Sequence, residues 1–275
     1  MMKKKFNAWN ITMFVFLAVA AVCVLYPLIF TLSASFADPY KFSANPLAFH
    51  FDAPENYVFA WDELKGSLFN STMIAVISVI GNTLITCMVS YAIGVLQFKG
   101  AKLISIFMLS GMFLTSEITS IPRLIMMNEA GFTGTVWALI IPYVFTPGGM
   151  SVILMSNFMK RIPYEIKEAA LLDGAGVKDM FFKVILPLSK PMIAFSAIQH
   201  FIGVWNDFLW PLISLGVFSE FKTLPLAAMG LKSLDLSMYT INFAGLVIIF
   251  LPTLLIYAFF SKYFLEGATV GAVKG

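Results

Sequence analysis

The sequence carries little charge, and that shortage excludes a soluble globular protein. Asp, Glu, Lys and Arg together make up only 12% of its 275 residues, whereas a soluble domain has about 25%. Hydrophobic residues make up 59%, and the mean hydropathy is +0.86. A helix that crosses a bilayer needs about 20 mostly apolar residues, so the chain has room for about six such helices and no separate soluble domain. The composition therefore predicts an all-α integral membrane protein.

Motifs that would give this chain chemistry of its own are also missing. The sequence has no Gly-x-x-x-x-Gly-Lys-Ser/Thr phosphate loop and no His-Glu-x-x-His zinc motif, so we expect it not to bind ATP itself. Its two cysteines, Cys23 and Cys87, lie inside apolar runs, which favours buried packing over a disulfide, a metal site or redox chemistry. The net charge of +3 is small and gives no indication of nucleic-acid binding. We expect no cofactor, no metal and no enzymatic activity.

Six apolar runs are long enough to be membrane spans. The first follows Lys3-Lys4-Lys5 and is longer than the apolar region of a signal peptide, so we interpret it as an uncleaved span. The fourth contains Pro142 and then Pro147-Gly148-Gly149, which predicts a bent or broken helix. The six runs cover about residues 11–32, 69–96, 103–121, 132–158, 192–215 and 241–265.

Two further segments have distinct compositions. Residues 38–66 are rich in Pro, Asp, Glu and aromatics, which predicts an exposed loop without long helices. The second span carries small polar residues four apart, a spacing that places them on one helix face and favours contact with another helix. This stripe consists of Ser78, Asn82, Thr86 and Ser90.

Basic residues are distributed unevenly between the two sides that these spans define. Lysine and arginine collect on the cytoplasmic side of membrane proteins. On this rule both termini and the loop at about 160–190 are cytoplasmic, in a cell membrane that the chain crosses several times. The cytoplasmic set is Lys3, Lys4, Lys5, Lys99, Lys102, Lys160, Arg161, Lys167, Lys178, Lys183, Lys190, Lys262 and Lys274, and the external set is Lys41, Lys65, Arg123, Lys222 and Lys232.

The loop at about 160–190 is polar in an otherwise apolar protein. Pro163 suits the first turn of a helix, and Glu168 favours the positive end of the helix dipole. Gly174 can take the left-handed conformation that ends a helix. A second short helix with one apolar side is expected over residues 175–186, ending at Pro187. The sequence therefore predicts a helix, a turn and a second helix.

This segment resembles the EAA loop in the membrane subunits of ABC importers. The pattern is Glu-Ala-Ala, three residues, Gly, nine residues and an aliphatic-x-Leu-Pro ending, with Val184 where the family usually has isoleucine. In the family this loop is the coupling helix, which docks into a cleft on the cytoplasmic ATPase. The resemblance implies a type I importer permease with six transmembrane helices. It assigns coupling to Glu168, Ala169, Ala170, Gly174 and Pro187.

The likeness extends over most of the chain and is closest to the carbohydrate-importer branch, the maltose-type permeases. The residues that carry it are Asn70-Ser71, Ser90-Tyr91-Ala92, Gly131-Phe132-Thr133-Gly134-Thr135, Trp205-Asn206-Asp207-Phe208-Leu209-Trp210-Pro211-Leu212 and the terminal Gly271-Ala272-Val273-Lys274-Gly275. Relatives usually have a bulkier apolar residue at Ala268. In that branch the tail reaches between the two ATPase subunits, a role implied here for Gly271, Lys274 and Gly275.

The resemblance also implies an organisation and a set of partners. A permease core at 67–265 follows a segment at 1–66 that holds the N-terminus, the first span and an external loop, and a cytoplasmic tail covers 266–275. The implied partners are a second homologous permease, a dimer of ATPase subunits that hold ATP and magnesium, an extracytoplasmic solute-binding protein and the lipid bilayer.

Polar residues inside the spans are candidates for a solute path, because charge within a membrane helix is expensive. Glu117 and Asp207 qualify, each toward the outer third of its span. Gln199, Gly203, Asn206 and Trp210 share one face of a continuous helix, and His200 and Asp207 lie seven apart on an adjoining face. Amides suit sugar hydroxyls and aromatic rings suit sugar CH faces. Helix packing uses the same residue types, so both interpretations stay open.

The sequence therefore predicts the permease subunit of an ATP-driven, binding-protein-dependent importer for a sugar, oligosaccharide or polyol. It would work by alternating access coupled to a separate ATPase. A proton-coupled secondary transporter using Glu117, His200 or Asp207 is the alternative, and a channel or an intramembrane hydrolase is more remote. A cytoplasmic ATPase-docking loop separates the first two, because a proton-coupled carrier needs none.

The distribution of basic residues predicts how single cysteines will label in intact cells. In a background without Cys23 and Cys87, cysteines at Ser43 and Ser233 should react with an impermeant thiol reagent added outside. A cysteine at Asp179 should react only after the membrane is permeabilised. Labelling at Asp179 in intact cells would overturn this orientation.

Overall fold

The computed structural model describes residues 8–216, 219–231 and 239–272, with side chains described within these ranges from Ile11 to Phe259. Every regular element in these ranges is a helix, which confirms the all-α prediction. The elements are α1 (Ala8–Ser35), α2 (Pro39–Ala44), α3 (Asn56–Tyr91), the π-helix η1 (Ala92–Leu96), α4 (Ala101–Gly111), α5 (Ser116–Glu129), α6 (Trp137–Phe145), α7 (Gly149–Lys160), α8 (Tyr164–Leu172), α9 (Val177–Asp179), the π-helix η2 (Met180–Ile185), α10 (Leu186–Leu188), α11 (Lys190–Asn206), α12 (Leu209–Leu215), α13 (Leu224–Ala228) and α14 (Tyr239–Ala272).

The helices are long and apolar enough for four to six membrane spans. Within the described ranges, the four candidate spans are Ile11–Ser35, Asn56–Leu96 (α3 with η1), Trp137–Lys160 (α6 with α7) and Tyr239–Phe259. Two bent pairs raise the number to six if each pair crosses as one span: Ala101–Gly111 with Ser116–Glu129, and Val177–Leu188 with Lys190–Asn206. The chain forms two compact units, unit 1 (Met1–Lys65 with Ala228–Leu251) and unit 2 (Gly66–Ala227 with Pro252–Gly275).

Residues 38–66 are mostly exposed, as predicted, but the prediction that they form a loop without long helices was wrong, because α2 and the first part of the long helix α3 lie within them. Pro39 lies in the first turn of α2, and Pro54 lies just before α3. A missing N–H costs no hydrogen bond at the start of a helix. Asp38 caps α2, since its Oδ1 accepts from two backbone N–H groups at 3.0 and 3.2 Å. Pro39 and Pro54 therefore lie at the starts of helices, whereas the sequence pattern predicted that they would prevent helices.

The third predicted span, at 103–121, is not one straight helix. α4 ends at Gly111 and α5 begins at Ser116, and the two axes differ by 105°. Thr115 is extended, with φ −71° and ψ 157°, and the Ser116 hydroxyl donates to the Glu117 carboxylate at 3.1 Å. Local side-chain bonds of this kind compete with helix formation. A short polar stretch thus breaks a run that its apolar content predicted to be continuous.

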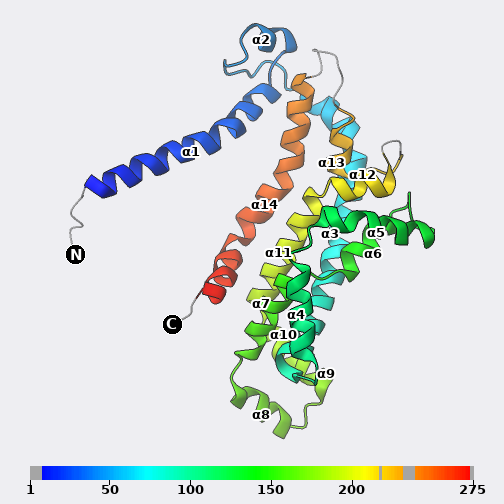
Figure 1. Cartoon of the computed structure of the whole chain (residues 1–275). Helices are drawn as coiled ribbons and strands as arrows, with labels where there is room; N and C mark the ends of the chain where they lie inside the picture. Colours follow the sequence, from blue (N-terminus) through cyan, green and yellow to red (C-terminus); the bar gives the residue numbers. More distant parts are fainter. Residues whose placement is uncertain (1–7, 217–218, 232–238, 273–275) are drawn as a thin grey trace. The chain divides into compact units, whose positions relative to one another are not determined.

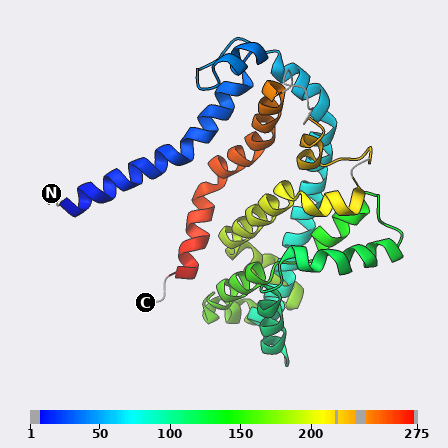
Figure 2. The ribbon, with the colours of Figure 1, turned by 45° about the horizontal axis from the view of Figure 1, so that its top comes forward.

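Unit 2 is organised around α7. Helices η1, α4 and α11 all pack against it. At one end of the unit α12 contacts α5 and α6 (Figure 2), and at the other end α8 projects beyond the neighbouring helices (Figure 1). One apolar cluster, which includes Tyr91, Met155 and Phe181, lies toward α8. A second, which includes Leu139 and Trp210, lies toward α12.

The polar stripe on α3 makes helix contacts, as the sequence predicted. Its four hydroxyl and amide residues are at most 2% exposed. Ser90 donates to the carbonyl oxygen of Val152 on α7 at 3.1 Å. Thr86 donates to Asn82 Oδ1 at 3.3 Å, which orients the Asn82 amide toward α6.

Glycine allows α7 to approach two neighbouring helices closely. A Cβ on Gly94 of η1 would lie 2.4 Å from the carbonyl oxygen of Ser156, and a Cβ on Gly149 would lie 2.3 Å from that of Met108. Both obstacles are backbone atoms, which cannot rotate away. Close approach at small residues is how helices associate in lipid, where no hydrophobic effect draws them together.

We predict that Gly94→Ala destabilises the folded subunit by about 1–3 kcal/mol, because the new methyl group must displace α7. The measurement is the unfolding temperature of the purified protein in detergent, together with its abundance in membranes. Gly66→Ala is the matched control, since a Cβ at that helical position meets nothing within 4 Å and alanine favours a helix over glycine. Equal stability of the two variants would contradict the prediction.

Candidate solute hollow and coupling loop

A polar hollow of about 520 Å³ lies in unit 2 between α3, the start of α5, α6, α7 and α11. Its walls carry an amide, a phenol, a hydroxyl, an imidazole and a carboxylate. This volume falls in the range of small-molecule sites, which use a few placed polar groups for specificity. The polar side chains that line it are Asn82, Ser116, Tyr143, Ser151, Gln199, His200, Asn206 and Asp207.

Asp207 reaches the hollow through a break in the fifth predicted span. The expected continuous helix over 192–215 was wrong: α11 ends at Asn206, Asp207 is extended at φ −69° and ψ 121°, and α12 begins at Leu209. The Asp207 carboxylate accepts from the Tyr143 hydroxyl at 2.9 Å and from the Trp210 backbone N–H at 3.1 Å. It thereby satisfies an N–H at the start of α12 and ties the break to α6.

A second helix break also borders the hollow. α6 ends at Phe145 and α7 begins at Gly149, which confirms the predicted break near Pro147. Pro147 has no N–H to donate to the carbonyl oxygen of Tyr143. Asn82 replaces it, since its Nδ2 donates to the carbonyl oxygens of Tyr143 and Val144 at 3.0 and 3.3 Å. The α3 stripe thus satisfies carbonyl groups that the break leaves unpaired.

The structure brings together four of the six predicted pathway residues. Those lining the hollow are Gln199, His200, Asn206 and Asp207. Trp210 lies elsewhere: its side chain is 3% exposed, its Nε1 donates to the carbonyl oxygen of Ala138 at 3.0 Å, and the Arg123 guanidinium lies 5.0 Å from its ring centroid. Glu117 is exposed in the first turn of α5, beside the lining residue Ser116. Trp210 therefore does not share a helix face with Gln199, and its contacts are those of packing.

The lining residues contributed by α3 and α6 were not predicted from the sequence. Tyr143 carried no signal, because its partner Asp207 lies 64 residues away along the chain. Asn82 was noticed as part of a polar stripe, but its place at the hollow depends on the break in α6. His200 contributes one feature that no pattern predicts: its Nε2 is buried and has no hydrogen-bond partner in the described part of the chain.

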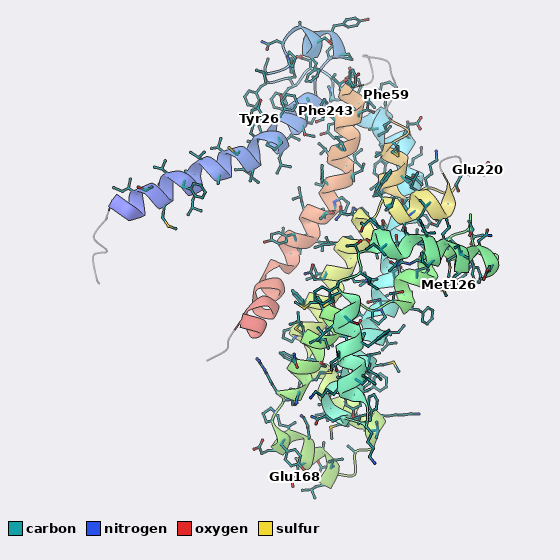
Figure 3. The ribbon with its side chains drawn as sticks, viewed as in Figure 1. Tyr26, Phe59, Met126, Glu168, Glu220 and Phe243 are labelled. Atoms are coloured by element: carbon teal, nitrogen blue, oxygen red, sulfur yellow. The ribbon has the colours of Figure 1, made fainter. Side chains whose placement is uncertain are left out.

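The loop predicted to couple to an ATPase is exposed at one end of unit 2. α8 has no buried residue, and Glu168 and Ala169 face solvent. Figure 3 shows Glu168 at the end of unit 2 remote from Met126 of α5. Apolar side chains are exposed here as well, with Tyr164 at 67% and Leu172 at 84%. An exposed helix that presents both carboxylates and large apolar groups is suited to contact with another protein.

Gly174 ends α8 in the left-handed conformation that the sequence predicted. Its φ is +83°. The Gly174 N–H donates to the carbonyl oxygen of Leu171 at 3.0 Å, and the Ala175 N–H donates to that of Ala170 at 2.9 Å. These two bonds form a Schellman motif, which closes the last carbonyls of a helix. A Cβ on Gly174 would meet nothing within 4 Å, so the position requires glycine for its backbone angle and not for space.

The second half of the loop, η2, is anchored in the core. Met180, Phe181 and Ile185 of η2 are buried. The Phe181 ring lies 5.1 Å from that of Tyr91, whose hydroxyl donates to the carbonyl oxygen of Val177 at 3.2 Å. Past Pro187 the chain bends by 80° into α11. The exposed α8 is therefore held by an element that packs against α3.

One helix joins the loop to the hollow. α11 begins at Lys190, directly after the loop, and ends at Asn206, at the hollow. Its 17 residues span about 25 Å at 1.5 Å per residue. A single helix thus runs from the end of the loop to the hollow.

The predicted tail contacts lie at the edge of the described structure. Gly271 belongs to the end of α14. Lys274 and Gly275 lie outside the described residues.

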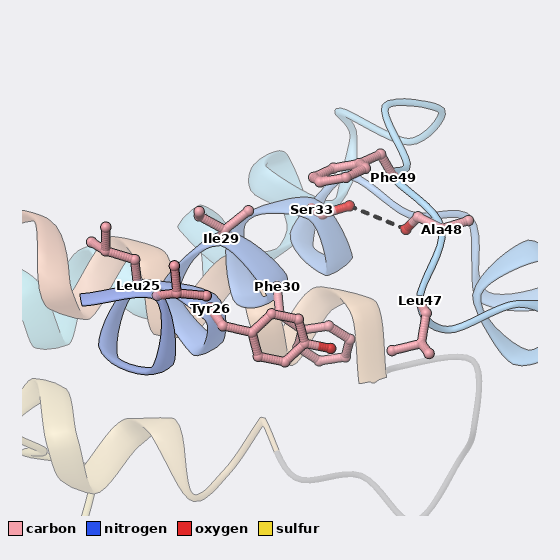
Figure 4. Close-up of a pocket in the computed structure, with 9 residues that line it drawn as sticks. Leu25, Tyr26, Ile29, Phe30, Ser33, Leu47, Ala48 and Phe49 are labelled. Carbon is pink, nitrogen blue, oxygen red and sulfur yellow. Dashed lines mark hydrogen bonds between the residues drawn. The ribbon is translucent and has the colours of Figure 1, made fainter. Parts of the chain in front are cut away.

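Unit 1 contains a hollow of a different character. It measures about 290 Å³ and is lined by apolar groups such as Leu25, Phe30 and Leu47 (Figure 4). Its one polar side chain apart from the Tyr26 hydroxyl is Ser33, whose hydroxyl donates to the carbonyl oxygen of Ala48 at 3.4 Å. A sugar would leave most of its hydroxyls unpaired here, so the polar hollow of unit 2 is the better candidate for a solute.

Apolar helices long enough to cross a membrane, a polar hollow among them and an exposed loop at one end are the architecture of a membrane transport protein. A family model described as binding-protein-dependent transport system inner membrane component matches residues 6–267. The chain belongs to this family, which confirms the kinship that the loop pattern indicated.

The chain has sugar-system permeases among its relatives. It is 32% identical over 285 residues to the arabinooligosaccharides transport system permease protein AraQ of Halalkalibacterium halodurans, with 100% of both chains covered. It is 29% identical over 278 residues to the multiple sugar-binding transport system permease protein MsmG of Streptococcus mutans, covering 99% of this chain and 100% of that protein. A crystal structure of a bacterial ABC transporter involved in the import of the acidic polysaccharide alginate contains a chain with the same fold, at a TM-score of 0.83 and 22% identity, covering 96% of this chain and 99% of that one.

The geometry of the hollow separates two kinds of polar residue. Gln199 is exposed in the hollow, so Gln199→Ala should change stability by less than about 0.5 kcal/mol while altering uptake in a solute-dependent way. Asp207→Ala removes both hydrogen bonds at the helix break and should cost about 1–3 kcal/mol. Unfolding temperature and uptake, both normalised to membrane abundance, distinguish the two. A large loss of stability in Gln199→Ala would assign that residue to packing.

Proposed function

We propose that this chain is the membrane-spanning permease subunit of an ATP-driven, binding-protein-dependent importer for a sugar or oligosaccharide. It works by alternating access. ATP binding closes the ATPase dimer, the exposed loop moves with it, and the hollow opens to the opposite side of the membrane. Both termini and the loop are cytoplasmic in this proposal.

The observation that carries the proposal is the direct connection between the exposed loop and the polar hollow. α8 presents Glu168 and large apolar groups to a partner, and the loop continues into α11, which ends at the hollow. Such an arrangement suits a subunit that receives force at one end and changes solute access at the other.

The proposed solute class rests on the hollow and on the relatives. Gln199, Asn206 and Ser151 offer hydrogen-bonding groups without a fixed charge. Asp207 is engaged with Tyr143 and a backbone N–H, so it is less available to a cation. A neutral polyhydroxylated solute fits this chemistry, and the names of AraQ and MsmG refer to sugars.

The proposal assigns ATP and magnesium to a separate ATPase dimer and solute delivery to an extracytoplasmic binding protein. It also includes a second homologous permease, so that the solute path lies between two chains. Membership of a family of binding-protein-dependent inner membrane components supports these partners.

The backbone at Gly174 gives a test of coupling. Gly174→Val places a β-branched residue at φ +83° and should cost about 1–2 kcal/mol, or roughly 5- to 30-fold in the docking equilibrium. Gly176→Val is the matched control, because Gly176 lies in the same turn and is equally open but has φ −75°. The measurement is uptake into vesicles holding the purified assembly, with and without internal ATP, alongside solute-stimulated ATP hydrolysis.

Three possible results test whether the loop couples uptake to ATP hydrolysis. ATP-dependent uptake that falls in Gly174→Val and persists in Gly176→Val supports the proposal, provided that both variants keep normal membrane abundance. Equal uptake in the two variants would remove the coupling role of the left-handed turn. Wild-type uptake driven by a proton gradient without ATP would instead establish a secondary transporter.

A further inference from the structure

A second polar hollow lies in unit 2, between η1, α4 and α7, and belongs to neither the solute hollow nor the loop. Its volume is about 480 Å³. The chain folds back here: Gln97 ends η1 in the left-handed region at φ 46°, and Gly100 leads into α4 at φ +101°. The turn places η1 and α4 on two sides of the hollow, and α7 forms its third side.

The hollow lies where apolar helices end. The candidate span Asn56–Leu96 stops beside it, the candidate span Trp137–Lys160 stops at one of its lining residues, and the helix pair that begins with Ala101 starts there. Three helix ends at one place put the hollow at the depth of the lipid headgroups, because helices of this kind extend across the hydrocarbon core.

The polar wall of the hollow is basic. Lys102 and Lys160 line it, and none of the lining residues in the described structure is acidic. Neither lysine forms an ion pair within the described part of the chain. Asn157 and Ser105 add hydrogen-bonding groups, and the first-turn N–H groups of α4 add positive partial charge. These groups together suit a phosphate.

The other wall of the hollow is apolar and continues onto an exposed helix face. Ile106 and Leu109 of α4 and Ile153 of α7 line the hollow. Beyond it α4 exposes Leu103 at 71% and Phe107 at 77%, as expected of a surface that faces acyl chains. A free phosphate or a soluble acidic peptide has no acyl chain to cover this apolar wall. A phospholipid has both a phosphate for the basic wall and an acyl chain for the apolar one.

We propose that the hollow between η1, α4 and α7 binds the headgroup of an anionic phospholipid, held by Lys102 and Lys160, with an acyl chain along α4. Basic pockets between membrane helices recognise such headgroups. The inference depends on the membrane location of the chain and not on the solute that it transports.

The test uses the full chain, purified with the subunits that accompany it, and a phosphatidylglycerol that carries a photoreactive group on one acyl chain. Labelled peptides are mapped by mass spectrometry, and the lipid concentration for half-maximal labelling of α4 and α7 is measured. Replacing Lys102 or Lys160 by glutamine should raise that concentration about fivefold each, and replacing both should raise it about 25-fold.

Controls separate charge, headgroup and position. The double variant Lys102→Arg with Lys160→Arg keeps the charge and should label like the wild type. Lys99→Gln is the matched control, since Lys99 is exposed in the same turn but does not line the hollow, and it should change labelling less than twofold. Unlabelled phosphatidylglycerol should compete, whereas phosphatidylcholine and glycerol phosphate should not.

Each remaining outcome overturns the proposal. If α4 and α7 are not labelled in the wild type, or if a partner subunit is labelled in their place, the hollow does not hold a lipid. If the double glutamine variant labels like the wild type, the two lysines do not recognise the headgroup. Equal competition by glycerol phosphate assigns the site to a soluble phosphate.

Discussion

Unit 2 depends on one constraint: a helix that breaks where water is scarce must find other partners for its unpaired backbone groups. Asn82 supplies donors to the carbonyls of Tyr143 and Val144 at the break between α6 and α7. Asp207 supplies an acceptor to the Trp210 N–H at the break between α11 and α12. The Tyr143 hydroxyl then joins the two breaks through Asp207. The polar hollow of unit 2 lies beside both breaks, and these three side chains hold the two breaks together.

The same constraint explains which parts of the fold follow from sequence. Uninterrupted apolar runs were predicted well: α1 and α14 contain the first and sixth expected spans. The break at Pro147 was also predictable, since proline removes a donor that the helix requires. The breaks at residues 112–115 and at Asp207 were not predictable, because they depend on competition between local polar bonds and the helix. Apolar content alone does not measure that competition.

The candidate site was predicted in part, and partly for the wrong reason. Gln199, His200, Asn206 and Asp207 do line one hollow, but Asp207 arrives there through a helix end and not along a shared face. The spacing along a continuous helix placed Trp210 on the same face as Gln199 and Asn206. Because the helix breaks after Asn206, Trp210 points into the core instead. In the loop the prediction for Gly174 was confirmed, because a left-handed turn after a helix has a strong local signal in glycine.

Polar residues around the hollow of unit 2 therefore fall into two groups, those bonded to other parts of the fold and those that are not. Asn82 and Asp207 are committed to backbone or side-chain partners, so changes there alter the fold before they alter transport. Gln199 is exposed in the hollow, and the buried Nε2 of His200 has no partner among the described residues. A buried polar atom without a partner costs free energy, but this atom is closed to the hollow, so the exposed amide of Gln199 is the more direct contact for a solute. Residues that determine solute specificity are accordingly to be sought first on α11, between Gln199 and Asn206. Asp207 comes second, because its carboxylate is already bonded to Tyr143 and to the Trp210 N–H.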